Sequence, residues 1–177
     1  MIMELLFSAS KIAKKVENLG LQINKEYQSK NLHILAILKG SFMFASDLAR
    51  NIEIPFHIDF IKISTYGNKD MPYDKPAITF DQKIDIKGQD VLVVDDILDT
   101  GHTLFAFNKL LCLMNPNSVK ICTLLDKSCR REANISPDFW GFRINDGFVV
   151  GYGLDYAEKY RGLPQIYVLN EEEIKQG

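Results

Sequence analysis

The strongest constraint on the fold is residues 91–103, in which an unbroken apolar run leads into an acidic turn. The run is Val-Leu-Val-Val, as expected of a strand that is covered on both faces. The turn, Asp-Asp-Ile-Leu-Asp-Thr-Gly-His-Thr, is followed by apolar residues at helical spacing, which stop at Asn115 and Pro116. The segment therefore predicts a buried strand, a polar turn and a helix in succession.

The rest of the chain repeats this alternation of strands and helices. The apolar runs that predict strands cover residues 33–38, 57–64, 77–80 and 119–125. The segments with helical spacing cover residues 8–20, 25–30 and 42–49. Gly20 is expected to end the first helix, because glycine is favoured just past a helix end. We expect one α/β domain over residues 1–177, with a largely parallel central sheet flanked by helices.

Composition and charge disfavour several other classes of protein. With 46% hydrophobic and 25% charged residues, the chain is too apolar to be disordered. The formal net charge of −2 disfavours a protein that coats nucleic acid, and no apolar run approaches the roughly 20 residues of a membrane span. The three cysteines have no Cys-x-x-Cys spacing, and the first residues lack signal-peptide features. We expect a cytoplasmic protein with no nucleic-acid or membrane partner.

Polar residues follow three of the predicted strands. Lys39 and Gly40 follow the first, residues 95–103 follow the strand at 91–94, and Asp126 and Lys127 follow the next. In open α/β sheets, ligands bind at the carboxyl ends of the strands. We therefore expect these three segments to converge on one site.

Two interpretations of the acidic turn are open at this stage. In the simpler one, Asp99 or Thr100 caps the next helix on a solvated turn. In the other, residues 99–103 form a phosphate cup, because they offer successive backbone N–H groups, two hydroxyls and a helix N-terminus. The chain has neither a P-loop nor a dinucleotide fingerprint. A phosphate cup beside Asp95 and Asp96 favours a sugar phosphate as ligand, with Mg²⁺ neutralising part of the charge.

Residues 91–103 resemble the phosphoribosyl-pyrophosphate (PRPP) signature of the type I phosphoribosyltransferases. Four further segments occur in the order seen in the hypoxanthine-guanine phosphoribosyltransferases: Leu38-Lys39-Gly40, Ser64-Thr65-Tyr66-Gly67, Asp126-Lys127 and residues 148–156. The resemblance covers roughly residues 34–169. It implies the type I phosphoribosyltransferase fold, with a small hood and a mobile lid loop at approximately residues 65–87, Thr65 and Tyr66 lying at its stem.

The resemblance also implies a reaction. Hypoxanthine or guanine takes the 5-phosphoribosyl group of PRPP at N9, giving IMP or GMP and pyrophosphate, with Mg²⁺ as cofactor. Such enzymes are commonly homodimers or homotetramers. Alternatives from the same superfamily are a xanthine-preferring enzyme and a PRPP-sensing regulator that binds nucleic acid. A receiver-type signalling domain also carries acids at strand ends, but the Thr-Gly-His-Thr sequence fits it poorly.

Roles at the PRPP site are carried over by position. Asp95 and Asp96 would bind the ribose hydroxyls and a metal ion. The backbone of Lys39 and Gly40, where the family often has a cis peptide, and the side chain of Arg161 would bind pyrophosphate. The residues that would cradle the 5′-phosphate are Asp99, Thr100, Gly101, His102 and Thr103.

The purine site is carried over in the same way. Asp99 would face N7 as the catalytic base, and the ring of Phe148 would stack on the purine. Lys127 is a pure donor and suits a 6-oxo group, whereas adenine would leave its charge unpaired. The backbone of Val149 would complete the edge contacts, and Asp155 would adjoin the purine and contact Mg²⁺.

Simpler roles remain open for three of these residues. Phe148 lies in an apolar run, where a phenylalanine more often belongs to the core. Lys127 beside Asp126 is compatible with an exposed ion pair worth under ~1 kcal/mol. Arg161 is compatible with a solvated surface side chain.

Overall fold

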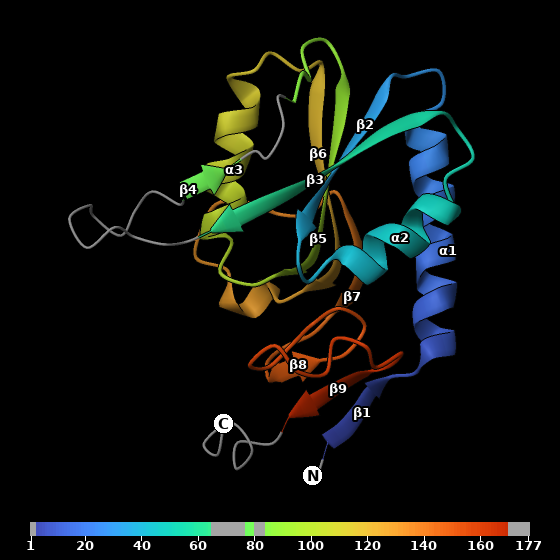
Figure 1. The fold of residues 1–177 in the computed structure, drawn as a ribbon, viewed down its shortest axis with the longest axis vertical. Helices are drawn as coiled ribbons and strands as arrows, with labels where there is room; N and C mark the ends of the chain where they lie inside the picture. Colours follow the sequence, from blue (N-terminus) through green and yellow to red (C-terminus); the bar gives the residue numbers. More distant parts are fainter. Residues whose placement is uncertain (1–2, 65–76, 80–83, 170–177) are drawn as a thin grey trace, which may run out of the picture.

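A six-stranded sheet forms the centre of the molecule (Figure 1). The computed structural model describes residues 3–64, 77–79 and 84–169. The strand order is β4-β3-β2-β5-β6-β7, with only β4 antiparallel to its neighbour. The strands are β2 (Leu32–Leu38), β3 (Phe56–Ser64), β4 (Ala77–Thr79), β5 (Asp90–Leu98), β6 (Ser118–Asp126) and β7 (Phe139–Arg143). The predicted α/β fold with a largely parallel sheet is confirmed.

Helices cover both faces of this sheet. They are α1 (Ala9–Glu26), α2 (Phe42–Arg50) and α3 (His102–Cys112), with a short 3₁₀ turn η1 (Ser128–Arg130). Successive side chains of β5 point to opposite faces of the sheet, so they join two different core clusters. Leu92 and Val94 pack with α1 and α2, whereas Val91 and Val93 pack with α3. No helix of the described residues is long and apolar enough to cross a membrane.

The sequence suggested that the first helix ends at Gly20, but this prediction is wrong. The helix continues to Glu26, so the separate helix predicted over 25–30 is wrong as well. A side chain at Gly20 would lie 2.6 Å from both the Cβ and the carbonyl oxygen of Asn51. This glycine is therefore needed for the close approach of α1 to the end of α2, and it does not act as a stop signal.

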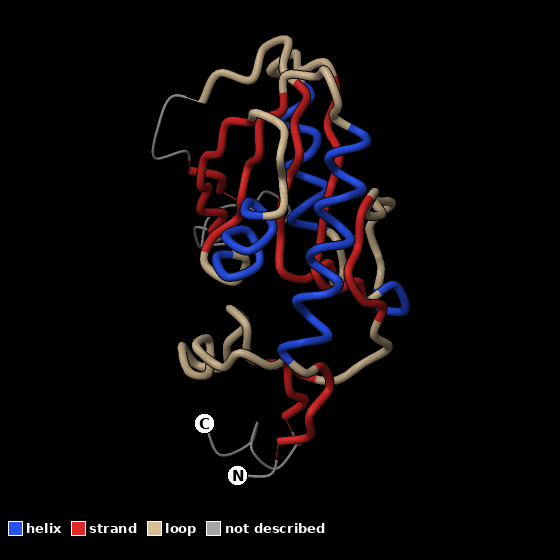
Figure 2. The backbone as a smooth tube through the Cα atoms, turned by 90° about the vertical axis from the view of Figure 1, so that its right-hand side faces the viewer, coloured by secondary structure: helices blue, strands red, loops and turns tan. Residues whose placement is uncertain are grey.

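A second, smaller sheet forms a hood beside the first. It contains β1 (Met3–Phe7), β9 (Ile166–Leu169) and β8 (Phe148–Val150), in that order and antiparallel. Figure 2 shows the hood strands beyond one end of the long helix α1. Phe7, Val149 and Ile166 belong to the same hydrophobic cluster as the buried face of α1. The hood is therefore packed onto the α1 side of the main core.

The central strand β5 is longer than the apolar run that predicted it. Its pairing with β2 ends at Val94, but its pairing with β6 continues to Leu98. Asp95 and Asp96 therefore lie on β5 itself, beyond the last residue of β5 that pairs with β2. The turn begins at Asp99 rather than directly after Val94.

Most of the segment predicted to be a lid, including Thr65 and Tyr66, lies outside the described residues. Within its approximate range of 65–87, residues 77–79 form β4 on the edge of the sheet. Ile86 is fully buried in the core beneath α3.

Candidate active site

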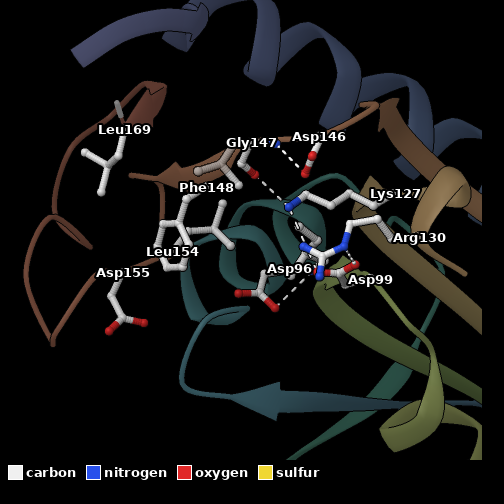
Figure 3. A pocket seen from close by; sticks show the side chains of 12 residues that line it. Asp96, Asp99, Lys127, Arg130, Asp146, Gly147, Phe148, Leu154, Asp155 and Leu169 are labelled. Atoms are coloured by element: carbon white, nitrogen blue, oxygen red, sulfur yellow. Dashed lines mark hydrogen bonds and ion pairs between the residues drawn. The ribbon is translucent and has the colours of Figure 1, made fainter. Parts of the chain in front are cut away.

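The carboxyl ends of β5 and β6 face the hood strands β8 and β9 across a cavity of about 490 Å³ (Figure 3). Figure 3 shows Lys127 and Arg130 converging on Asp99 at one side, with Phe148 and Leu154 at the other. A cavity of this volume is in the range that accepts small organic ligands.

The turn after β2 reaches this cavity through close contacts at two glycines. A side chain at Gly40 would collide with the carboxylate of Asp96, and one at Gly153 would collide with the carbonyl oxygen of Gly40. The end of β2, the acidic part of β5 and the loop after β8 therefore touch one another. The cis peptide is Leu38–Lys39, one bond before the Lys39–Gly40 position expected from the sequence.

The two acids of β5 face different spaces. Asp96 lines the main cavity, whereas Asp95 lines a smaller hollow of about 190 Å³ together with Thr100 and Thr103. Burial raises the pKa of both carboxyl groups, and the neighbouring charge of Asp96 raises the pKa of Asp95 further. Groups that donate hydrogen bonds or carry positive charge would therefore be favoured beside this pair.

Asp99 and Lys127 form the polar wall of the main cavity. Lys127 is only 4% exposed, and its Nζ donates to the carbonyl oxygen of Gly147 at 2.7 Å and lies 4.0 Å from Asp99 Oδ2. Arg130 Nε is 3.4 Å from Asp99 Oδ1, but this buried oxygen accepts no hydrogen bond. The exposed Lys127–Asp126 ion pair considered above is wrong, because Asp126 is buried and pairs with two arginines, Arg131 and Arg143.

Phe148 lies on the apolar wall and is 41% exposed, so its assignment to the core is wrong. The Tyr156 ring meets it edge to face, with the centroids 5.3 Å apart and the planes at 82°. Val149, the next residue, is buried. Its side chain belongs to the core, so it offers the cavity mainly its backbone.

A chain of charges joins the turn after β2 to the loop after β8. Lys39 Nζ lies 3.1 Å from Glu158 Oε2, which is 3.4 Å from Arg161 Nη2. The same Arg161 nitrogen is 2.8 Å from Asp155 Oδ1, and Nη1 donates to the carbonyl oxygen of Gly153 at 2.8 Å. The hydrogen bond from Lys39 lowers the pKa of Glu158. Arg161 is only 19% exposed, so its assignment as a solvated surface side chain is wrong.

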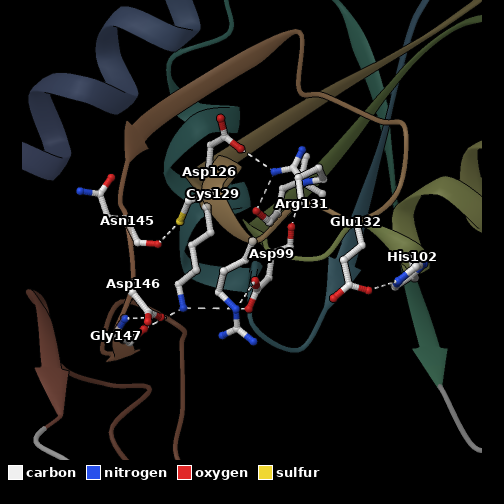
Figure 4. A network of polar contacts seen from close by, with 12 residues as sticks. Asp99, His102, Asp126, Cys129, Arg131, Glu132, Asn145, Asp146 and Gly147 are labelled. Atoms are coloured by element: carbon white, nitrogen blue, oxygen red, sulfur yellow. Dashed lines mark hydrogen bonds and ion pairs between the residues drawn. The ribbon is translucent and has the colours of Figure 1, made fainter.

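Residues 98–103, here called the phosphate loop, join β5 to α3. Gly101 has φ of +87°, which favours glycine, and a side chain there would lie 2.7 Å from Ile135 Cγ2. Thr100, Gly101 and Thr103 line the smaller hollow. The side chain of His102 is exposed and pairs instead with Glu132 at 2.7 Å (Figure 4).

Comparison with known proteins identifies the family. Residues 4–157 match the model of the phosphoribosyl transferase domain. The chain belongs to this family. The family prediction made from residues 91–103 is therefore confirmed.

Among similar phosphoribosyltransferases, the hypoxanthine enzyme of Escherichia coli K12 is 42% identical over 92% of this chain and 93% of its own. The hypoxanthine-guanine enzyme of Bacillus subtilis 168 is 42% identical over 95% of this chain and 93% of its own. The crystal structure of a hypoxanthine phosphoribosyltransferase from Staphylococcus aureus is 44% identical and superposes with a TM-score of 0.90, covering 96% of this chain and 92% of that one.

Three residues in or beside the cavity were not anticipated from the sequence. Arg130 lines the cavity, Arg131 binds the loop behind it, and Glu158 joins Lys39 to Arg161. Two adjacent arginines close behind the end of a strand were the available signal. Two adjacent arginines are also common on solvated surfaces, so this signal was not sufficient to identify a binding site.

The acids that could hold a metal ion are dispersed. Among residues 3–64, 77–79 and 84–169, no three His, Cys, Asp or Glu side chains are grouped to hold one by themselves. Asp95 and Asp96 nevertheless supply hard oxygen ligands whose mutual repulsion a divalent cation would relieve. The donor set fits a Mg²⁺ ion that is shared with substrate and water oxygens.

Proposed function

We propose that this protein is a purine-salvage enzyme that transfers the 5-phosphoribosyl group of PRPP to N9 of hypoxanthine or guanine, giving IMP or GMP and pyrophosphate. Its similarity to hypoxanthine and hypoxanthine-guanine phosphoribosyltransferases, over more than nine tenths of each chain, supports this activity. The observation that carries the proposal is that one cavity contains both Asp99, whose buried Oδ1 accepts no hydrogen bond, and the buried ammonium group of Lys127.

The cavity offers a 6-oxopurine one stacking surface and two hydrogen-bonding partners. The ring of Phe148 supplies a stacking surface worth about 1–3 kcal/mol, which does not depend on the identity of the base. The ammonium of Lys127 donates to the 6-oxo group, and the free oxygen of Asp99 accepts from N7–H. Adenine has an amino group at position 6, so it would leave the buried charge of Lys127 unpaired.

We propose that the enzyme accelerates the reaction by positioning the two substrates and by stabilising the charges that develop on them. N9 forms a bond to ribose C1 as the bond from C1 to pyrophosphate breaks, and pyrophosphate leaves with the bonding electrons. The N7 proton passes to Asp99. Asp95 and Asp96 accept hydrogen bonds from the ribose hydroxyls and favour positive charge on the sugar, while Arg161 and the Lys39–Gly40 backbone bind the leaving group.

Asp95, Asp96 and Asp155 are the residues that we propose to hold Mg²⁺. When bound, the ion would neutralise charge on the departing pyrophosphate. Asp155 is paired with Arg161 in this structure. The finer sequence-based expectations of a cytoplasmic homodimer or homotetramer without a nucleic-acid partner stay predictions.

A spectrophotometric assay with PRPP, Mg²⁺ and five nucleobases tests the proposal. We expect turnover with hypoxanthine and guanine, and none above background with adenine, orotate or uracil. Xanthine, run as a separate sample, measures the preference among 6-oxopurines. Turnover with adenine at the rate of hypoxanthine would contradict the role of Lys127, and no turnover with any base would contradict the activity.

A further inference from the structure

Arg131 packs against the phosphate loop but lines neither of the two cavities described above. Its side chain is 13% exposed, and its guanidinium donates four hydrogen bonds. Figure 4 shows Arg131 between Asp126 and Asp99. Nε donates to the carbonyl oxygen of Asp99 at 2.8 Å, and Nη2 donates to that of Leu98 at 2.9 Å. The other two reach the carbonyl oxygen of Ile135 at 2.7 Å and the buried carboxylate of Asp126 at 2.6 Å.

Backbone groups beside Arg131 bind the same stretch of loop. The N–H of Lys127 donates to the carbonyl oxygen of Leu98 at 2.9 Å. The N–H groups of residues 132 and 133 both donate to the carbonyl oxygen of Thr100 at 3.0 Å. Three successive carbonyl groups, those of residues 98–100, are therefore turned toward the segment 127–133.

This orientation decides where the loop N–H groups point. In a trans peptide the N–H points opposite to the carbonyl of the same peptide unit, and the only cis bond among the described residues is Leu38–Lys39. The N–H groups of Asp99, Thr100 and Gly101 are therefore directed away from residues 127–133. Asp99, Thr100 and Gly101 are also the residues that, together with Thr103, line the smaller hollow. A reversed peptide would present a carbonyl dipole to an anion instead.

We propose that Arg131 is a positioning residue that fixes the N–H groups of the phosphate loop toward the 5′-phosphate of the substrate. This inference rests on the proposed function, since it takes that phosphate as the ligand of the loop. Only a planar fork reaches both loop carbonyls and Asp126 at once, and the single nitrogen of lysine cannot. The orienting effect therefore depends on arginine and not only on positive charge.

The chain offers a matched control in Arg143. Arg143 Nε lies 3.4 Å from the other oxygen of Asp126, but its side chain is 63% exposed. The hydrogen bonds to the carbonyls of residues 98–100 come from Arg131 and the 127–133 backbone. Arg131→Lys and Arg143→Lys therefore perturb the same buried carboxylate, but only the first removes side-chain hydrogen bonds to the phosphate loop.

The experiment measures ribose 5-phosphate binding by calorimetry and the kinetic constants for both substrates in the wild type and the two variants. We expect R131K to weaken ribose 5-phosphate binding at least tenfold and to raise KM for PRPP similarly. We expect KM for hypoxanthine to change less than threefold, and R143K to match the wild type. In an NMR titration with inorganic phosphate, the Gly101 amide resonance should shift in the wild type and much less in R131K.

Equal ribose 5-phosphate affinity in R131K and the wild type would overturn the inference. Equal losses for PRPP and hypoxanthine would also overturn it, because they would indicate a general structural role. If R131K does not fold, Asp126→Asn keeps the guanidinium but removes its buried anchor, and unchanged ribose 5-phosphate binding there would overturn the inference as well. A wild-type protein that binds PRPP but not ribose 5-phosphate would count against Arg131 alone, whereas failure to bind either would overturn the proposed function too.

Discussion

The two sides of the cavity are built differently. On the strand-end side, Lys127 and Asp126 are 4% and 2% exposed, and the loop carbonyls are bound by Arg131 and its neighbours. On the hood side, the side chain of Glu158 is 66% exposed and is held mainly by ion pairs with Lys39 and Arg161. The strand-end side is therefore set before a ligand arrives, whereas the hood side can exchange its partners for a ligand.

Backbone conformation sharpens this contrast. Four non-glycine residues of the hood loop have positive φ: Tyr152 at 51°, Ala157 at 50°, Glu158 at 61° and Tyr160 at 75°. Each costs about 1 kcal/mol or more relative to a right-handed conformation. Left-handed backbone of this kind is concentrated at functional sites, and here it accompanies the segment that carries Asp155 and Arg161.

The largest effect is expected on the strand-end side. Asp99→Asn should lower kcat by about 10²–10⁴, because an amide cannot accept the N7 proton. Its Tm should change little. Asp146→Asn is the matched control, since Asp146 lines the same cavity but its carboxylate accepts only from the N–H of Gly147 in the described contacts. A near-normal rate in D99N, measured under saturating substrates, would remove Asp99 from the mechanism.

Lys127→Ala should act on the base and not on PRPP. Loss of a charged donor in a buried site costs about 1.5–3 kcal/mol, so KM for hypoxanthine should rise roughly 10- to 100-fold. KM for PRPP should change less than threefold. Initial-rate kinetics with each substrate varied in turn measure both constants. Equal losses for the two substrates would contradict the assignment of Lys127 to the purine.

On the hood side, Arg161→Ala should raise KM for PRPP about tenfold and leave KM for hypoxanthine nearly unchanged. The guanidinium is partly exposed, so its contribution should be smaller than that of a fully buried charge and should fall with added salt. Kinetics at 50 and 300 mM KCl measure this difference. An effect larger than that of Lys127→Ala, or one independent of salt, would break the contrast between the two sides.

Asp95→Asn should stabilise the protein at neutral pH. Because the pKa of Asp95 is raised in the folded state, its favourable contribution is complete below its unfolded value and is lost as pH rises through the folded value. Removing the charge should therefore raise Tm at pH 7 by about 2–4 °C, or ~1 kcal/mol, and the gain should vanish near pH 4. Calorimetry without divalent cations measures it.

The matched variant on the hood side is Asp155→Asn. It loses an ion pair with Arg161, so it should show no gain in Tm at pH 7. A lower Tm for D95N at pH 7 would show that the Asp95 charge stabilises the fold, contrary to this account.

The smallest effect concerns Glu158, whose carboxylate forms ion pairs with Lys39 and Arg161, the latter proposed to bind pyrophosphate. Glu158→Gln should remove a competing anion and lower KM for PRPP about twofold at low salt. The difference should disappear at high salt, because the group is fully exposed to screening. A raised KM at low salt would mean that Glu158 orders the cations and does not compete with the ligand.

The sequence was most informative where polar residues directly follow a predicted strand. Residues 91–103 predicted the central strand, the polar turn and α3. The expected convergence of strand ends placed Gly40, Asp96 and Lys127 in one region, where the structure also brings them together. Such inferences succeed because the carboxyl ends of parallel strands necessarily share one edge of the sheet.

The remaining features depend on contacts between distant segments. The length of α1 depends on how Gly20 meets Asn51, and the hood depends on pairing Met3 with Leu169. Arg131 binds backbone carbonyls, which carry no side-chain pattern that a sequence could reveal. The choice between core and cavity for Phe148 likewise required knowledge of what covers each face.

The most direct test of the central claim is a crystal structure of the protein with IMP. We predict the 5′-phosphate on the N–H groups of residues 99–103, the ribose hydroxyls at Asp95 and Asp96, and the purine against Phe148 with its 6-oxo group at Lys127 Nζ. A nucleotide whose phosphate lies outside the phosphate loop, or whose base lies away from Lys127, would contradict the account.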